Sequence, residues 1–323
     1  MKINFKIAIV VFAVTSVNVF SLGSQENVPK ADVISQANQT VQANQVQART
    51  EPSRAEQVMR ALASAYPQQI ERVEFRAAAG HSDWAVLMRG TWYFFSEGKL
   101  LPENLLAGAG NYTPQPFYNY QAELPPWKTP TAEEAARFRS MASSRNQNPP
   151  RRSSHFFDDL WRAHNQNESY ERVKSIRFLG YPVTVHYLIL ENLSLVEEQI
   201  IASSRNDQQV RTWMNNISSL EGWVWRNIAD TQSRSYHSYG LAIDILQKSY
   251  GGKETYWLWA SNRKADWWNI SYNERYHPPA AVIKAFERYG FIWGGKWLYF
   301  DTMHFEYRPE ILILSGMPPE TRR

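Results

Sequence analysis

The chain has no cysteine among its 323 residues. This absence excludes disulfide bonds, a thiol nucleophile and zinc sites built from thiolates. It does not argue against export, because a chain of this length can bury a core that needs no covalent cross-links.

A large surplus of charge of one sign is also missing. The formal net charge is +4, and residues 1–23 carry two lysines and no acid, so the rest of the chain carries +4 − 2 = +2. Without a dense basic face, nucleic-acid binding has little electrostatic support, and we expect no nucleic-acid partner.

Long hydrophobic runs are absent too. The apolar run at residues 7–14 is far shorter than the roughly 20 residues of a membrane span. Lys2 and Lys6 flank its start and small residues follow at 21–23, which is typical of a secretory signal. We therefore expect a signal peptide at residues 1–23, export to the periplasm or cell envelope, and no stable membrane insertion after its removal. An uncleaved anchor is the alternative.

Composition divides the remaining chain into three parts. Residues 24–50 are rich in Gln, Asn, Val and Ala and predict a flexible linker, with a marginal helix as the alternative. Residues 110–153 carry many Pro, Asn, Ser and Arg, which indicates a boundary near residue 150. We expect an N-terminal module of unknown role at 51–150 and a second domain at 151–315.

Periodicity predicts the elements of both parts. In the first, a helix is expected at 52–66, a small β-meander over 84–89 and 91–95, and a helix at 131–137. For the second part, the expected helices and strands lie at 157–161, 183–186, 193–201, 241–246 and 278–289. The fold class is therefore α+β: an antiparallel-sheet domain with flanking helices, preceded by a smaller α/β module.

One segment combines chemistry-bearing residues with a permitted turn. His237 and Asp244 are seven positions apart, so a straight strand would place them on opposite faces. Gly240 between them permits a sharp turn that folds His237 back over the strand of Asp244. Small Ala242 lies on the same strand face as Asp244 and leaves room for an ion.

A second segment supplies His304, with Asp301 three residues before it. Imidazole nitrogen and carboxylate oxygen suit zinc, and three protein ligands leave a fourth position for a water whose pKa the metal lowers. A carboxylate must then take the proton of that water, and Asp301 is the natural candidate.

Each of these residues also has a structural interpretation. A single histidine is usually structural, and Asp244 within Leu-Ala-Ile-Asp-Ile-Leu could be balanced by an arginine instead of a metal ion. The other histidines considered lack companion carboxylates at a suggestive spacing, and we interpret them as structural: His81, His155, His164 and His277.

The spacing Ser-x-His-x-x-Gly-x-Ala-x-Asp, followed by Asp-x-x-His, resembles the VanY-like D-alanyl-D-alanine carboxypeptidases, a family of LAS-type zinc metallopeptidases. The resemblance covers roughly residues 155–315. It implies that His237, Asp244 and His304 bind Zn²⁺ and that Asp301 is the catalytic base.

The resemblance also implies an arginine that binds substrate or stabilises charge at the scissile carbonyl. Arg226 is our candidate and Arg234 its competitor, with a surface ion pair as the structural alternative. Ser235 orients substrate or shapes the loop. Glu306 and His304 lie on the same face of a strand. Glu306 therefore either contacts the metal-binding His304 without binding the metal itself, or replaces Asp301 as the base.

The expected activity is zinc-dependent hydrolysis of peptidoglycan stem peptides, as a D-alanyl-D-alanine carboxypeptidase. One alternative is a murein endopeptidase of the L-Ala–D-Glu type; another is a non-catalytic wall-binding protein that retains the fold. Four tryptophans either wall a substrate groove or pack a loop: Trp257, Trp259, Trp267 and Trp268.

Overall fold

The computed structural model describes residues 51–320. The expected signal at residues 1–23 and the expected linker at 24–50 lie outside the described residues. From Pro52 onward the chain forms one compact unit. None of the helices in its described part combines the length and apolar character needed to cross a bilayer.

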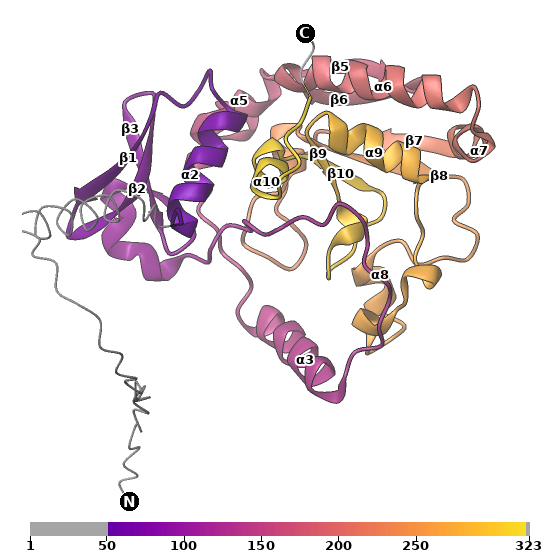
Figure 1. The fold of residues 1–323 in the computed structure, drawn as a ribbon, viewed down its shortest axis with the longest axis horizontal. Coiled ribbons are helices and arrows are strands. Elements are labelled where there is room, and N and C mark those ends of the chain that lie inside the picture. Colours follow the sequence, from indigo (N-terminus) through magenta and orange to yellow (C-terminus); the bar gives the residue numbers. More distant parts are fainter. Residues whose placement is uncertain (1–50, 321–323) are drawn as a thin grey trace, which may run out of the picture. The chain divides into compact units, whose positions relative to one another are not determined.

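A helix and a meander of strands open the described part (Figure 1). The helix is α2, at Arg54–Ala65, and its buried side chains lie at helical spacing, which confirms the first predicted helix. The strands are β1 (Arg72–Ala78), β2 (His81–Met88), β3 (Thr91–Ser96) and β4 (Lys99–Pro102). They pair antiparallel in chain order, so the predicted β-meander is also confirmed.

A 3-10 segment, η1 (Glu103–Asn111), leads into a connection that is largely irregular until residue 154. Helix α3 (Ala132–Gln147) interrupts it, and a capping box between Thr131 and Glu134 fixes its first turn. No side chain of α3 is buried, although Phe138 packs against a neighbouring aromatic cluster. The helix predicted at 131–137 is thus confirmed, and it extends to Gln147.

The rest of the chain alternates helices and antiparallel strands. The helices are α4 (His155–Trp161), α5 (Gln166–Tyr170), α6 (Leu190–Ser204), α7 (Gln208–Asn215), α8 (Trp257–Ser261), α9 (Ala280–Arg288) and α10 (Pro309–Leu314). Short 3-10 turns are η2 (Tyr187–Ile189), η3 (Tyr236–Tyr239), η4 (Trp267–Asn269), η5 (Tyr272–Glu274) and η6 (Gly294–Lys296).

Two sheets lie in this part. A hairpin joins β5 (Val173–Phe178) to β6 (Tyr181–His186). A four-stranded antiparallel sheet has the order β7–β8–β10–β9, with β7 (Ile217–Glu221), β8 (Ala242–Gln247), β9 (Phe291–Trp293) and β10 (His304–Tyr307). Helix α9 packs against β9 and against α6 (Figure 1). The described fold is mixed α+β with antiparallel sheets, as predicted.

One hydrophobic cluster contains residues from both sides of residue 150. Val58 and Leu62 of α2 belong to the same buried cluster as Trp161, Phe286 and Phe305. Burial of such side chains is the main stabilising contribution to a fold. The division into two modules remains a prediction about chain organisation, and the stability of the two parts is shared.

Candidate active site

His237 lies on the short 3-10 turn η3, which precedes β8. Ser235 is buried, and its Oγ accepts a hydrogen bond from the backbone N–H of His237 at 3.3 Å. Gly240 ends the turn with φ at +71°, and a Cβ added there would lie 2.7 Å from the backbone nitrogen of His186. Only glycine fits this position, so the chain reverses between His237 and β8 as the sequence predicts.

The three predicted metal ligands come together on η3, β8 and β10. His304 is the register partner of Asp244, with His304 Nδ1 2.8 Å from Asp244 Oδ1. His237 Nε2 lies 3.3 Å from Asp244 Oδ2. One potential ligand atom from each residue lies within 4.8 Å of the other two, so the group could hold a metal ion.

Each histidine presents one ring nitrogen to this group and uses the other to contact an oxygen outside it. His237 Nδ1 donates to the carbonyl oxygen of Gly222 at 2.6 Å, and His304 Nε2 lies 3.1 Å from Glu306 Oε2. Contacts of this kind fix the tautomer and orientation of metal-binding imidazoles. Two imidazoles and one carboxylate form a donor set that fits zinc and leaves a coordination position open.

The electrostatics of the group favour a bound cation. Burial opposes the charge of Asp244, but the charges and hydrogen bonds of His237 and His304 lower its pKa. Burial likewise opposes a charged His304, yet hydrogen bonds to Asp244 and Glu306 raise its pKa. A metal ion would compete with the proton on His304 for the same nitrogen and would neutralise the same carboxylate.

Asp301 lies at the turn that leads into β10, and its Oδ1 is buried with no hydrogen-bond partner among residues 51–320. Burial and the neighbouring charge of Asp244 raise the pKa of Asp301. An acceptor with an unused bonding position and a raised pKa suits the transfer of a proton. Asp301, the predicted base, also lines the same cavity as the three predicted metal ligands.

A line of buried polar groups runs from His304 to α2, and we name it the buried charge chain: Glu306, Arg308, Glu310 and Tyr66. Arg308 donates from Nη1 to Glu306 at 3.2 Å and from Nε to Glu310 at 2.5 Å. The Tyr66 hydroxyl donates to the other oxygen of Glu310 at 2.6 Å. Glu306 therefore binds a histidine and an arginine at once, which favours the interpretation that it orients His304.

Sequence reasoning missed Arg308 and Glu310. Arg308 follows His304 and Glu306 at intervals of two, and this alternation along one strand face could have indicated it. Nothing in the local pattern indicates Tyr66, which lies 244 positions from its partner Glu310.

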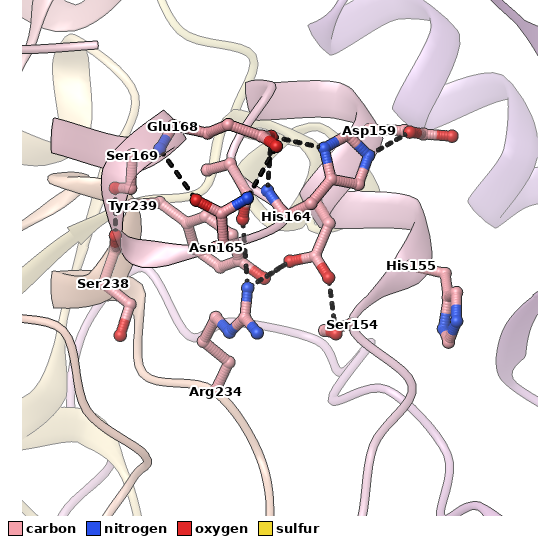
Figure 2. Close-up of polar contacts among 12 residues, drawn as sticks. Ser154, His155, Asp159, His164, Asn165, Glu168, Ser169, Arg234, Ser238 and Tyr239 are labelled. Carbon is pink, nitrogen blue, oxygen red and sulfur yellow. Dashed lines mark hydrogen bonds and ion pairs between the residues drawn. The ribbon is translucent and has the colours of Figure 1, made fainter. Parts of the chain in front are cut away.

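The two candidate arginines have different surroundings. Arg226 is exposed, lines the cavity and has no ion pair within the described range, while its backbone N–H donates to Ser238 Oγ at 2.9 Å. Arg234 donates from Nη1 to Asp158 at 2.7 Å and to the Ala163 carbonyl at 3.0 Å (Figure 2). The charge of Arg234 is thus neutralised by a structural ion pair, and Arg226 remains available to a ligand.

Figure 2 also shows a histidine with two carboxylate partners. His164 contacts Asp159 through Nε2 at 2.6 Å and Glu168 through Nδ1 at 2.7 Å, so the interpretation that it lacks companion carboxylates was wrong. Burial opposes its charge, but these two hydrogen bonds raise its pKa. A protonated imidazole between two carboxylates is a structural clamp, because both ring nitrogens are occupied.

The cavity lined by His237, Asp244 and His304 has a volume of about 730 Å³. Trp257 and Trp259 line it together with the predicted ligands, Asp301, Arg226 and Ser235. Trp267 and Trp268 are instead buried in a cluster with Trp257. Two of the four tryptophans therefore face the cavity, and the other two pack the loop behind it.

Comparison with known proteins gives two partial matches. Residues 229–307 match the model of a family described as D-alanyl-D-alanine carboxypeptidase. Residues 58–117 match the model of a domain of unknown function. No curated protein and no solved structure matches the chain. The first match contains the three predicted ligands and Asp301, and it supports a peptidase related to D-alanyl-D-alanine carboxypeptidases.

Proposed function

We propose that this chain is an exported zinc peptidase that hydrolyses peptidoglycan stem peptides and releases terminal D-alanine. The observation that carries the proposal is the approach of His237, Asp244 and His304, whose ligand atoms lie within 4.8 Å of one another beside a cavity. The similarity of residues 229–307 to D-alanyl-D-alanine carboxypeptidases supports the reaction class.

The three ligands would hold the metal through His237 Nε2, His304 Nδ1 and a carboxylate oxygen of Asp244. When bound, zinc supplies Lewis acidity toward the scissile carbonyl and lowers the pKa of water. Gly222 and Glu306 orient the two imidazoles from behind. This support keeps the ligands in place while substrate enters and product leaves.

Asp301 performs the proton transfers. Its Oδ1, which has no hydrogen-bond partner in the described part of the chain, accepts a proton from the attacking water and then delivers that proton to the departing amine nitrogen. Burial, the largest cause that raises the pKa of Asp301, does not depend on the charge of Asp244. It makes both transfers accessible, since a strongly acidic carboxylate would not hold the proton long enough to return it.

Arg226 stabilises the negative charge that develops on the scissile carbonyl oxygen, or binds the peptide that carries it. It has a cavity-facing position and no carboxylate partner within residues 51–320. Ser235 acts mainly through the loop, because its hydroxyl is already bound to the backbone of His237.

The test incubates the purified chain with defined muropeptides, with and without a chelator, and identifies the products by mass spectrometry. We expect products shortened by one D-alanine, lost with the chelator and restored by zinc. Products divided between L-Ala and D-Glu would instead identify an endopeptidase. If zinc restores no product while wall binding persists, the protein is a non-catalytic binding protein.

Two variants separate the roles within the site. Asp301→Ala should retain zinc and lose roughly 100-fold or more of the activity, since a general base contributes about that much. His237→Ala should lose the metal itself. Full activity of Asp301→Ala would exclude Asp301 as the base and point to Glu306.

A further inference from the structure

The cavity includes two arginines that lie outside both family matches. Arg145 is in the last turn of α3, and Arg152 follows in the irregular segment before α4. Neither belongs to residues 58–117 or 229–307, the segments that match known family models. These side chains are therefore a property of this chain's own connection and not of the matched segments.

Arg152 is held in place by its backbone. Its N–H donates to Ser233 Oγ at 3.0 Å, and Ser233 in turn donates to the carbonyl oxygen of Pro150 at 2.9 Å. Nε of Arg152 donates to the carbonyl oxygen of Pro114 at 3.2 Å. Only the Nε contact involves the guanidinium, and Nη1 and Nη2 have no hydrogen bond to any described residue.

Arg145 is held by aromatic rings. Its guanidinium carbon lies 4.7 Å from the ring centroid of Tyr299 and 5.5 Å from that of Trp257. Nη2 donates to the carbonyl oxygen of Ala229 at 3.0 Å, while Nε is buried without a partner in the described structure. Stacking of this kind fixes the planar group and leaves hydrogen-bonding edges available.

Positive charge is concentrated in this part of the wall. Neither Arg145 nor Arg152 forms an ion pair within residues 51–320, and burial together with the charges of Arg145 and Arg308 lowers the pKa of Arg152. Arg308 and Tyr236 belong to the wall of the same cavity. Nη2 of Arg308 and the hydroxyl of Tyr236 are buried without partners among the described residues. Buried donors without partners are costly, and a bound anion would satisfy them.

We propose that Arg145 and Arg152 form an anion subsite that binds a carboxylate of the peptide substrate. Guanidinium groups match carboxylates through paired N–H donors, and they retain their charge when partly buried. The identity of the ligand rests on the proposed function, because the anionic groups of a peptide are its C-terminal carboxylate and its acidic side chains. The subsite is formed by residues of the connection, so it is additional to Arg226.

The experiment uses four tetrapeptides that end in D-alanyl-D-alanine. They carry either glutamate or glutamine at the same position, and either a free or an amidated C-terminus. Binding to the full chain is measured by calorimetry after metal removal, and KM and kcat are measured with zinc. We expect Arg152→Gln and Arg145→Gln each to weaken binding on the order of tenfold. The loss should occur only for the peptides that contain the carboxylate bound by the subsite, which is either the C-terminal one or that of glutamate.

Arg151→Gln is the matched control, because Arg151 is the exposed neighbour of Arg152 and does not line the cavity. It should bind all four peptides as the wild type does. Arg152→Lys keeps the charge and should recover part of the affinity. Circular dichroism shows whether each variant folds. If Arg152→Gln does not fold, the comparison uses Arg145→Gln.

The outcomes distinguish the two proposals. A loss confined to free C-termini identifies the terminal carboxylate as the ligand, and a loss confined to glutamate peptides identifies a side chain. If both variants bind all four peptides as the wild type does, or weaken all four equally, the subsite does not exist. If the wild type binds in an arginine-dependent way but never hydrolyses, the proposed function fails and the subsite stands.

Discussion

Replacing Gly240 by alanine tests whether the turn before β8 holds His237 over Asp244. The matched control is Gly90→Ala in the turn between β2 and β3. The two glycines have nearly the same backbone conformation, with φ at +71° and +77°. They differ in the space around them, because a Cβ on Gly90 meets nothing within 4 Å.

The magnitudes follow from this difference. A left-handed conformation costs a residue with a Cβ roughly 1–2 kcal/mol, and both variants incur this cost. At Gly240 the new Cβ would also lie 2.7 Å from the backbone nitrogen of His186 and 2.7 Å from Val173 Cγ1. Overpacking of this kind costs about 1–3 kcal/mol more. We therefore expect Gly240→Ala to lose roughly 2–5 kcal/mol and Gly90→Ala roughly 1–2 kcal/mol.

The assay is urea unfolding of both variants, combined with zinc affinity from competition with a chelator. Gly240→Ala should also bind zinc more weakly, because relief of the clash displaces His237 from Asp244. Gly90→Ala should bind zinc as the wild type does. Equal losses of stability together with unchanged zinc affinity in both variants would refute the role assigned to this turn.

Three further predictions concern buried charge. Glu310→Gln should lower the free energy of unfolding, measured in urea, by about 3 kcal/mol, because it removes the negative charge that compensates the fully buried Arg308. The control Glu123→Gln should leave the free energy of unfolding unchanged, because the Glu123–Lys284 pair is exposed. Glu306→Gln should weaken zinc binding about 10–100-fold in chelator competition, and unchanged affinity would contradict its orienting role. Burial lowers the pKa of His186 to about 4, so the folded state binds fewer protons than the unfolded chain between about pH 6.5 and 4. The wild type should lose on the order of 3 kcal/mol relative to His186→Gln as the pH falls through that window, and parallel stability curves would contradict this.

Local signals explain what could be predicted. The alternation along β8 and the glycine at 240 each act within a few positions, so the sequence displays them directly. The approach of His237 and Asp244 followed from one turn residue and the parity of one strand. The pairing of His304 with Asp244 needed the resemblance to a family, because nothing local specifies a contact across 60 positions.

Long-range contacts of irregular chain explain what could not be predicted. Arg145 reaches the cavity from the last turn of α3, beyond the predicted helix at 131–137. Arg152 reaches it from irregular chain, and such chain carries no periodicity that indicates a partner. The backbone bonds of this irregular chain to residues 232 and 233 join it to the site loop.

The buried charge chain connects α2 to His304, one of the three residues proposed to bind zinc. Tyr66 directly follows α2, and its hydroxyl is the far end of a line of buried groups that reaches His304. A ligand that binds the folded state resists every local opening that breaks its site. Amide hydrogens of α2 should therefore exchange with solvent more slowly when zinc is bound, and the helix becomes a reporter of metal occupancy in a distant part of the sequence.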